Sequence, residues 1–327
     1  MTGEIRFAVL GPVRAWRDNS ELRTGAPQQQ AVLAALLLRE GAQVSTSGLI
    51  DAVWGSVPPR SAAATVRTYI YRLRQSLDDG GERLIASISD GYALRLGTDA
   101  LDLARCHAWL ARSQAAREEG GTALAAVCLR EALALWAGTP LAGVPGQFAA
   151  SWRAALADLR LALTEELLSL ELELGRHVRA AAELSALVAE NPLRERLREL
   201  HVLALYSSGR QAAALAALED FRHLLRDELG VDPGPGLRRV QRIVLTGQQT
   251  YAETFPATCP APPAPALPAP LPEGPPLPPS GCPGPGRCAA AAAAAAAPGF
   301  PAVPTAQPTA PGTSRSAPST RAPAAPV

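Results

Sequence analysis

The sequence predicts a mainly α-helical protein in three parts: an N-terminal winged helix-turn-helix, an all-α tetratricopeptide-like domain and a disordered Pro/Ala-rich tail. Within residues 1–98, strand-like runs are followed by three helical patterns and a hairpin signal. Residues 99–248 are almost wholly helical in pattern. Residues 256–327 hold 22 prolines and four charged side chains, so they have too little apolar surface to offset chain entropy. The expected domains are therefore residues 1–98, 99–248 and 249–327.

Short strands open the first part. The runs IRFAVLG and VRAWR have β-like composition and are separated by Gly-Pro, a turn signal. A third strand is expected to include Glu21–Arg23. The first helix is expected to begin near Pro27, because proline is favoured at the first helical position. Its pattern stays apolar on one side through Leu38.

Two more helices and a hairpin complete this part. Ser45 is a candidate N-cap of the second helix, and Gly55 is a natural residue just after its end. Ser61 is the candidate N-cap of the third helix, and Asp90-Gly91 between two β-like runs is a strong hairpin signal. Helices followed by a hairpin in this order indicate a winged helix. The residues expected to form its core are Leu33, Leu36, Leu37, Leu49, Ile50, Val53, Trp54, Val66, Ile70, Leu73, Leu77, Ile85, Ile88 and Leu94.

The third helix has two patterned faces. One is apolar, with residues at steps of four, three and four, and at about 100° per residue a second set centres on the opposite side. The segment from Ser61 to Leu77 has no acidic residue. The apolar residues are Val66, Ile70, Leu73 and Leu77. The residues on the opposite face are Thr68, Tyr71, Arg72 and Gln75.

The second face suits the reading of DNA bases. Arginine can bond guanine in bidentate fashion, glutamine can do so with adenine, and threonine offers a methyl group to thymine. These four residues are therefore expected to read bases, and Arg67 and Arg74 on one shoulder are expected to meet phosphates. An ordinary solvated face is the alternative. The lack of acidic residues and the position before a hairpin favour the recognition helix.

The helical part contains a repeat. Gly175 and Gly209 are turn glycines 34 residues apart, the tetratricopeptide period, and Gly120 marks a further turn. Each is followed by alanine five residues on and leucine nine residues on. The small residue lets two antiparallel helices approach, and the large one fills the groove above it. The surplus between Gly120 and Gly175 holds the Gly/Pro loop WAGTPLAGVPG.

Several functional classes find no support. The sequence has no lysine, which excludes a P-loop, and it has neither GxSxG nor HExxH. The four histidines are scattered, so we expect no enzyme activity, cofactor or metal. Cys106 and Cys128 fall in helical patterns and are expected to be buried. The start lacks a signal-peptide pattern and no apolar run approaches a membrane span, so a cytoplasmic protein is expected.

The net charge of +1 gives the protein no overall positive field that would attract nucleic acid, so a nucleic-acid partner would have to bind a local patch of positive charge.

Four stretches of the first part resemble the OmpR-type winged helix of the Streptomyces antibiotic regulatory proteins, the SARP family. They are FAVLGPVRAWRDN, APQQQAVLAALLLREGAQVSTSGLIDAVWG, PPRSAAATVRTYIYRLRQSL and DGYALRL. The helical part resembles the bacterial transcriptional activator domain that follows in that family. This resemblance is carried by LREALALWAG and by the stretch from Asn191 to Leu245. The resemblance is to the small SARP class, because no ATPase module is present.

The resemblance implies a transcriptional activator, usually of a secondary-metabolite (antibiotic) gene cluster. Its partners would be double-stranded DNA, bound at direct repeats near the promoter −35 element as a homodimer or in tandem, and RNA polymerase. It places base-facing positions at Thr68 and Arg72, with Tyr71 and Arg74 nearby.

The wing departs from the family pattern. Relatives often have a wing arginine that enters the minor groove, but the stretch SISDGYAL has none. Minor-groove contact is therefore in doubt, while Arg83 and Arg95 on either side are expected to reach phosphates. Two other functions stay open: a tetratricopeptide-like protein-interaction adaptor, and a regulator whose repeat groove senses a small ligand.

Overall fold

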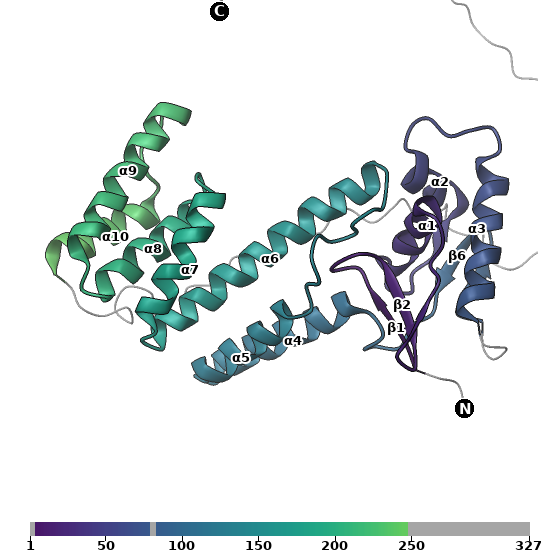
Figure 1. The fold of residues 1–327 in the computed structure, drawn as a ribbon, viewed down its shortest axis with the longest axis horizontal. Helices are drawn as coiled ribbons and strands as arrows, with labels where there is room; N and C mark the ends of the chain where they lie inside the picture. Colours follow the sequence, from purple (N-terminus) through teal and green to yellow (C-terminus); the bar gives the residue numbers. More distant parts are fainter. Residues whose placement is uncertain (1–3, 79–82, 248–327) are drawn as a thin grey trace, which may run out of the picture. The chain divides into compact units, whose positions relative to one another are not determined.

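The computed structural model describes residues 4–78 and 83–247, and it confirms the mainly helical fold class (Figure 1). The first three strands form an antiparallel sheet in the order β1-β2-β3. The third strand includes Glu21 and Leu22 but not Arg23, and it begins at Ser20 because Asp18 and Asn19 form a two-residue turn with φ of 46° and 71°. Aspartate and asparagine tolerate this left-handed region better than most residues. The strands are β1 (Ile5–Ala8), β2 (Arg14–Arg17) and β3 (Ser20–Leu22).

Three helices follow, as predicted. Ser45 caps the second, since the Gly48 N–H donates to its Oγ at 3.0 Å. Ser61 lies at the N-cap position of the third helix, as predicted, but its side chain makes no cap hydrogen bond. Its φ of −89° and ψ of 6° lie outside the extended conformation of an N-cap. The helices are α1 (Pro27–Leu37), α2 (Thr46–Trp54) and α3 (Ala62–Leu77).

The wing is a sheet in the order β4-β6-β5, with β4 (Val44–Ser45), β5 (Ile85–Ile88) and β6 (Gly91–Leu94). The hairpin is confirmed, but its turn is Ser89-Asp90, one residue before the expected Asp90-Gly91. Gly91 instead lies in β6 opposite Ser45. A Cβ at Gly91 would lie 2.2 Å from the Val44 carbonyl oxygen, so glycine permits the approach of β4.

The described residues of the second part, up to residue 247, form seven helices. The turn glycines 120, 175 and 209 each separate two helices and have φ of 77°, 78° and 77°. The alanines and leucines five and nine residues after them are all buried, which confirms the repeat. The helices are α4 (Asp102–Glu118), α5 (Thr122–Leu133), α6 (Gln147–Glu173), α7 (His177–Glu190), α8 (Glu195–Ser207), α9 (Gln211–Leu229) and α10 (Pro235–Thr246).

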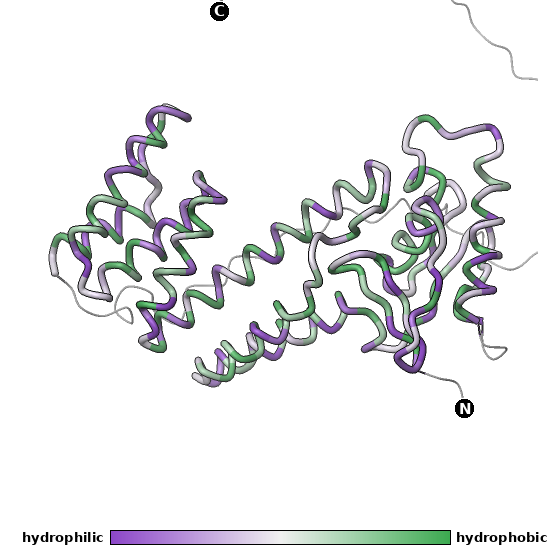
Figure 2. The backbone as a smooth tube through the Cα atoms, in the orientation of Figure 1, coloured by the Kyte–Doolittle hydropathy of each residue, from purple (hydrophilic) through white to green (hydrophobic). Residues whose placement is uncertain are grey.

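The winged helix and the first helices of the second part share one hydrophobic core, which extends from Phe7 to Leu170. A second core extends from Leu168 to Val244. In Figure 2 hydrophobic positions (green) and hydrophilic ones (purple) lie on the same helices, as this packing requires. Most of the expected winged-helix core is buried. The exceptions, Ile50, Trp54 and Ile88, are only partly buried.

Backbone contacts join the two parts. The Phe7 N–H donates to the Ala100 carbonyl at 2.7 Å. The buried Asp102 carboxylate accepts the N–H groups of Val9 at 2.9 Å and Leu10 at 2.9 Å. The carbonyl of Leu10 in turn accepts the N–H of Ala137. The segment after β1 thus both donates hydrogen bonds to residues of the second part and accepts hydrogen bonds from them.

The remaining structural predictions concern the cysteines, membrane-spanning segments and the tail. Cys106 and Cys128 are free and buried, as expected. Among the described residues, no helix is long and apolar enough to cross a membrane. The predicted disordered tail lies outside the described residues.

Candidate nucleic-acid interface

One side of α3 anchors the helix in the winged-helix core. Val66, Ile70, Leu73 and Leu77 are at most 1% exposed, and α3 packs against α1 and α2. Burying four branched apolar side chains contributes roughly 1.5–3 kcal/mol each relative to exposure. This buried stripe fixes which residues of α3 face solvent.

The other side of α3 is open. Thr68, Tyr71, Arg72 and Gln75 are all exposed, and Tyr71 is 61% exposed despite its large aromatic ring. The Thr68 hydroxyl donates to the Ala64 carbonyl at 3.0 Å within the helix, so its hydrogen is already used. The Gln75 amide donates to the Tyr71 hydroxyl at 2.9 Å. The structure therefore brings the four expected base-reading residues onto one exposed surface, which we call the α3 face.

The two shoulder arginines differ. Arg67 is exposed. Arg74 is half-buried, and its guanidinium donates to the Ile85 carbonyl at 3.0 and 2.8 Å and to the Ser87 hydroxyl at 2.9 Å. It also lies 5.9 Å from the centre of the Tyr92 ring. Arg74 thus ties α3 to the wing, a role that sequence reasoning missed, and its phosphate contact stays a prediction.

The wing presents positive charge at its flanks and not at its tip. Arg83 and Arg95 are both exposed, and the backbone N–H of Arg95 donates to the Leu84 carbonyl. The exposed tip is held to the start of α2, because the Asp90 carbonyl accepts the N–H of Thr46 at 3.0 Å. An aspartate at the tip repels phosphates, which agrees with the doubt about minor-groove contact.

Sequence reasoning also missed Arg60, which is exposed just before α3. The signal in the sequence was a positively charged side chain directly before Ser61, the candidate N-cap of this helix. Arg67 and Arg72 are exposed on α3, and Arg60 adds a positive charge just before this helix, which has no acidic residue. Such a surface can neutralise phosphates around the groups that read bases.

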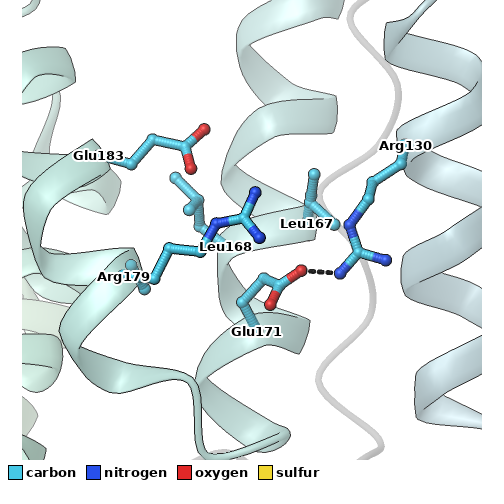
Figure 3. Close-up of a pocket in the computed structure, with 7 residues that line it drawn as sticks. Arg130, Leu167, Leu168, Glu171, Arg179 and Glu183 are labelled. Atoms are coloured by element: carbon cyan, nitrogen blue, oxygen red, sulfur yellow. Dashed lines mark hydrogen bonds and ion pairs between the residues drawn. The ribbon is translucent and has the colours of Figure 1, made fainter.

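A separate small hollow lies between α5, α6 and α7 (Figure 3). Its volume is about 70 Å³, and its floor includes Leu167 and Leu168. Glu171 in its wall bonds Arg130 and Arg176. Burial would raise the pKa of Glu171, but its bonds to and the charges of the two arginines together lower it. The charges around Glu171 thus stabilise helix packing and do not by themselves define a ligand.

Metal ligation has no candidate in the described residues: no group of three or more histidine, cysteine, aspartate or glutamate side chains could hold an ion.

Comparison with known proteins agrees with this arrangement. Residues 21–94 match the family model "transcriptional regulatory protein, C terminal", and residues 101–245 match the "bacterial transcriptional activator domain". The regulatory protein DnrI of Streptomyces peucetius is 31% identical over 250 residues, which cover 74% of this chain and 92% of DnrI. The chain belongs to the SARP family. The members of this family are transcriptional regulators, not enzymes.

Other relatives of this SARP chain are longer. The regulatory protein AfsR of Streptomyces coelicolor is 53% identical over 258 residues, which cover 79% of this chain and 26% of AfsR. The chain thus spans about a quarter of the length of AfsR. The solved structure of EmbR from Mycobacterium tuberculosis, in complex with a low affinity phosphopeptide, has a TM-score of 0.74 and 32% identity. That match covers 77% of this chain and 67% of EmbR.

Proposed function

We propose that this SARP chain is a sequence-specific DNA-binding transcriptional activator that reads bases through the α3 face. The observation that supports this most is the division of α3 into a buried apolar stripe and an exposed face without acidic residues. A helix inserted in the major groove needs both: one side must hold it rigidly, and the other must offer hydrogen-bonding groups.

The roles of the residues follow from their exposure. Thr68, Tyr71, Arg72 and Gln75 read base edges. Arg67, Arg83 and Arg95 meet phosphates, and Arg74 adds a phosphate contact when it gives up part of its bonding to β5. The aliphatic and aromatic parts of Tyr71 fill space against the bases. Specificity then comes from α3 and affinity largely from the arginines.

The biological setting is inferred from the family. We propose binding to direct repeats near a promoter −35 element, as a homodimer or in tandem, recruitment of RNA polymerase, and control of a secondary-metabolite gene cluster. A cytoplasmic location follows from contact with promoter DNA. The division into residues 1–98, 99–248 and 249–327 is part of this proposal, with the first range binding DNA.

The alternatives have less support. A protein-interaction adaptor would use the helical repeats, but it gives no reason for the acid-free face of α3. A ligand sensor would use a cavity such as the hollow between α5, α6 and α7, whose volume of about 70 Å³ has room for only a few water-sized groups.

The direct test is a binding assay with labelled promoter fragments from the gene cluster next to the coding gene. We expect a sequence-selective shift and a footprint over direct repeats, with affinity that falls steeply as salt rises. Absence of any selective shift at all salt concentrations up to about 200 mM would overturn the proposal.

A further inference from the structure

Helix α10 resembles α3 in its charge. Among the helices of the described residues, α3 and α10 have arginine and no acidic residue, whereas the other helices with arginine also have glutamate or aspartate. The arginines of α10 are Arg238, Arg239 and Arg242, and all three are exposed. The function proposed above makes no use of them.

Three residues of α10 form one exposed stripe. Arg238, Arg242 and Leu245 follow one another at steps of four and three, so they lie on one side of the helix. Leu245 is 64% exposed. Within residues 4–78 and 83–247, no acidic side chain forms an ion pair with Arg238 or Arg242. We call these three residues the α10 stripe.

Arg239 is different and lies on the shoulder of the stripe. Its charge acts on the buried carboxylate of Glu199 in α8 and favours the charged form of that group. Part of its positive charge is therefore balanced within the protein. Because of this interaction with Glu199, Arg239 is not counted as part of the α10 stripe.

The α10 stripe is held rigidly. On the opposite side of the helix Leu237, Val240 and Val244 are at most 1% exposed. The Glu195 carboxylate accepts the N–H of Gly234 at 2.9 Å at the start of α10, and the Gln211 amide donates to the Val244 carbonyl at 3.0 Å near its end. A surface fixed in this way loses little entropy when a partner binds.

We propose that the α10 stripe docks an acidic amphipathic helix of a protein partner. Two carboxylates one turn apart on that helix would pair with Arg238 and Arg242, and an apolar residue one turn further would cover Leu245. A DNA backbone would satisfy the arginines, but it would gain nothing from Leu245. Charge complementarity together with the exposed leucine therefore favours a protein over DNA.

This inference rests on the proposed function for its partner, the transcription machinery. The probe is RNA polymerase holoenzyme from Streptomyces coelicolor, added without DNA to the immobilised full-length chain. The variants are R238E/R242E and L245A. The control is R226E, which reverses one charge, half the change of R238E/R242E, at another exposed arginine in the neighbouring helix α9. Thermal unfolding midpoints establish that all variants are folded.

We expect R238E/R242E to weaken polymerase binding about tenfold or more and L245A to weaken it about threefold. The effect of R226E, counted twice to match the two charges reversed in R238E/R242E, should stay within about twofold. Promoter DNA affinity, measured separately without polymerase, should be unchanged in every variant. This pattern would support the proposal.

Three results would overturn it. Wild-type protein could fail to bind polymerase, R238E/R242E could bind it as R226E does, or R238E/R242E could lose promoter affinity with a flatter salt dependence. The last result would make α10 a DNA contact. Because promoter binding by the wild type is a separate arm, failure of the proposed DNA-binding function is seen independently of failure at α10.

Discussion

Replacing Asp102 by asparagine should change how the stability of the protein depends on pH. The Asp102 side chain is buried and accepts the N–H groups of Val9, Leu10 and Leu103. Burial raises its pKa from 3.8 to about 6, although these hydrogen bonds and the charge of Arg105 oppose the rise. This carboxyl group lies where the segment after β1 meets α4, so its protonation affects the connection between the two parts.

The sign and size of the effect follow from the pKa. Because the pKa of the folded state is above that of the unfolded state, the folded protein holds more protons between pH 3.8 and about 6. The contribution of Asp102 to stability is therefore fully present at lower pH and is lost as pH rises through about 6. A shift of about two pH units corresponds to roughly 3 kcal/mol. Asparagine does not titrate, so it provides the reference.

The assay is urea unfolding of the wild type and of Asp102→Asn from pH 4 to pH 7. The free energy of unfolding of the wild type, minus that of the variant, should fall by about 2.4 kcal/mol over this range, because the rest of the loss occurs below pH 4, where the unfolded carboxyl begins to ionise. Asp99→Asn is the control, since Asp99 is exposed three residues earlier in the chain. A difference that stays constant or rises with pH would show that the pKa of Asp102 is not raised by folding, because the backbone hydrogen bonds would then outweigh burial.

Three further predictions concern packing. Gly91→Ala should cost about 1–3 kcal/mol in urea unfolding, because its Cβ would meet the Val44 carbonyl, whereas Gly97→Ala, with no atom within 4 Å of the new Cβ, should be nearly neutral. Ile70→Ala should cost about 2–5 kcal/mol in the same assay, and a loss below 1 kcal/mol would contradict its burial. Burial, with a smaller effect of the Asp102 charge, raises the pKa of Cys106 to about 12. Iodoacetamide at pH 8 should therefore modify Cys106 only after unfolding, as read by peptide mass spectrometry.

Local signals predicted most of the fold. The Ser45 cap, the hairpin and the turn glycines depend on residues within a few positions of one another, and the structure has all of them. The one-residue error at the hairpin has a long-range cause. Gly91 is needed for its approach to Val44, and no short-range pattern reports that contact.

The candidate site was predictable in part for the same reason. The periodicity of α3 is local, so the exposure of Thr68 and Arg72 follows from the sequence. The bonds of Arg74 to Ile85 and Ser87 join separate elements, and those of Asp102 to Val9 span 93 residues. Such contacts depend on how separate elements pack together, and the periodicity of a single helix does not predict that packing.

Base reading by the α3 face is tested most directly by the affinity of Arg72→Ala for a set of operator variants with single base changes. We predict a loss of about 1–3 kcal/mol on the native operator and a loss of discrimination at one base position. Arg67→Ala is the matched control, and it should weaken all sequences alike and flatten the salt dependence. Equal weakening of every operator by Arg72→Ala, or full discrimination by this variant, would contradict base reading by Arg72.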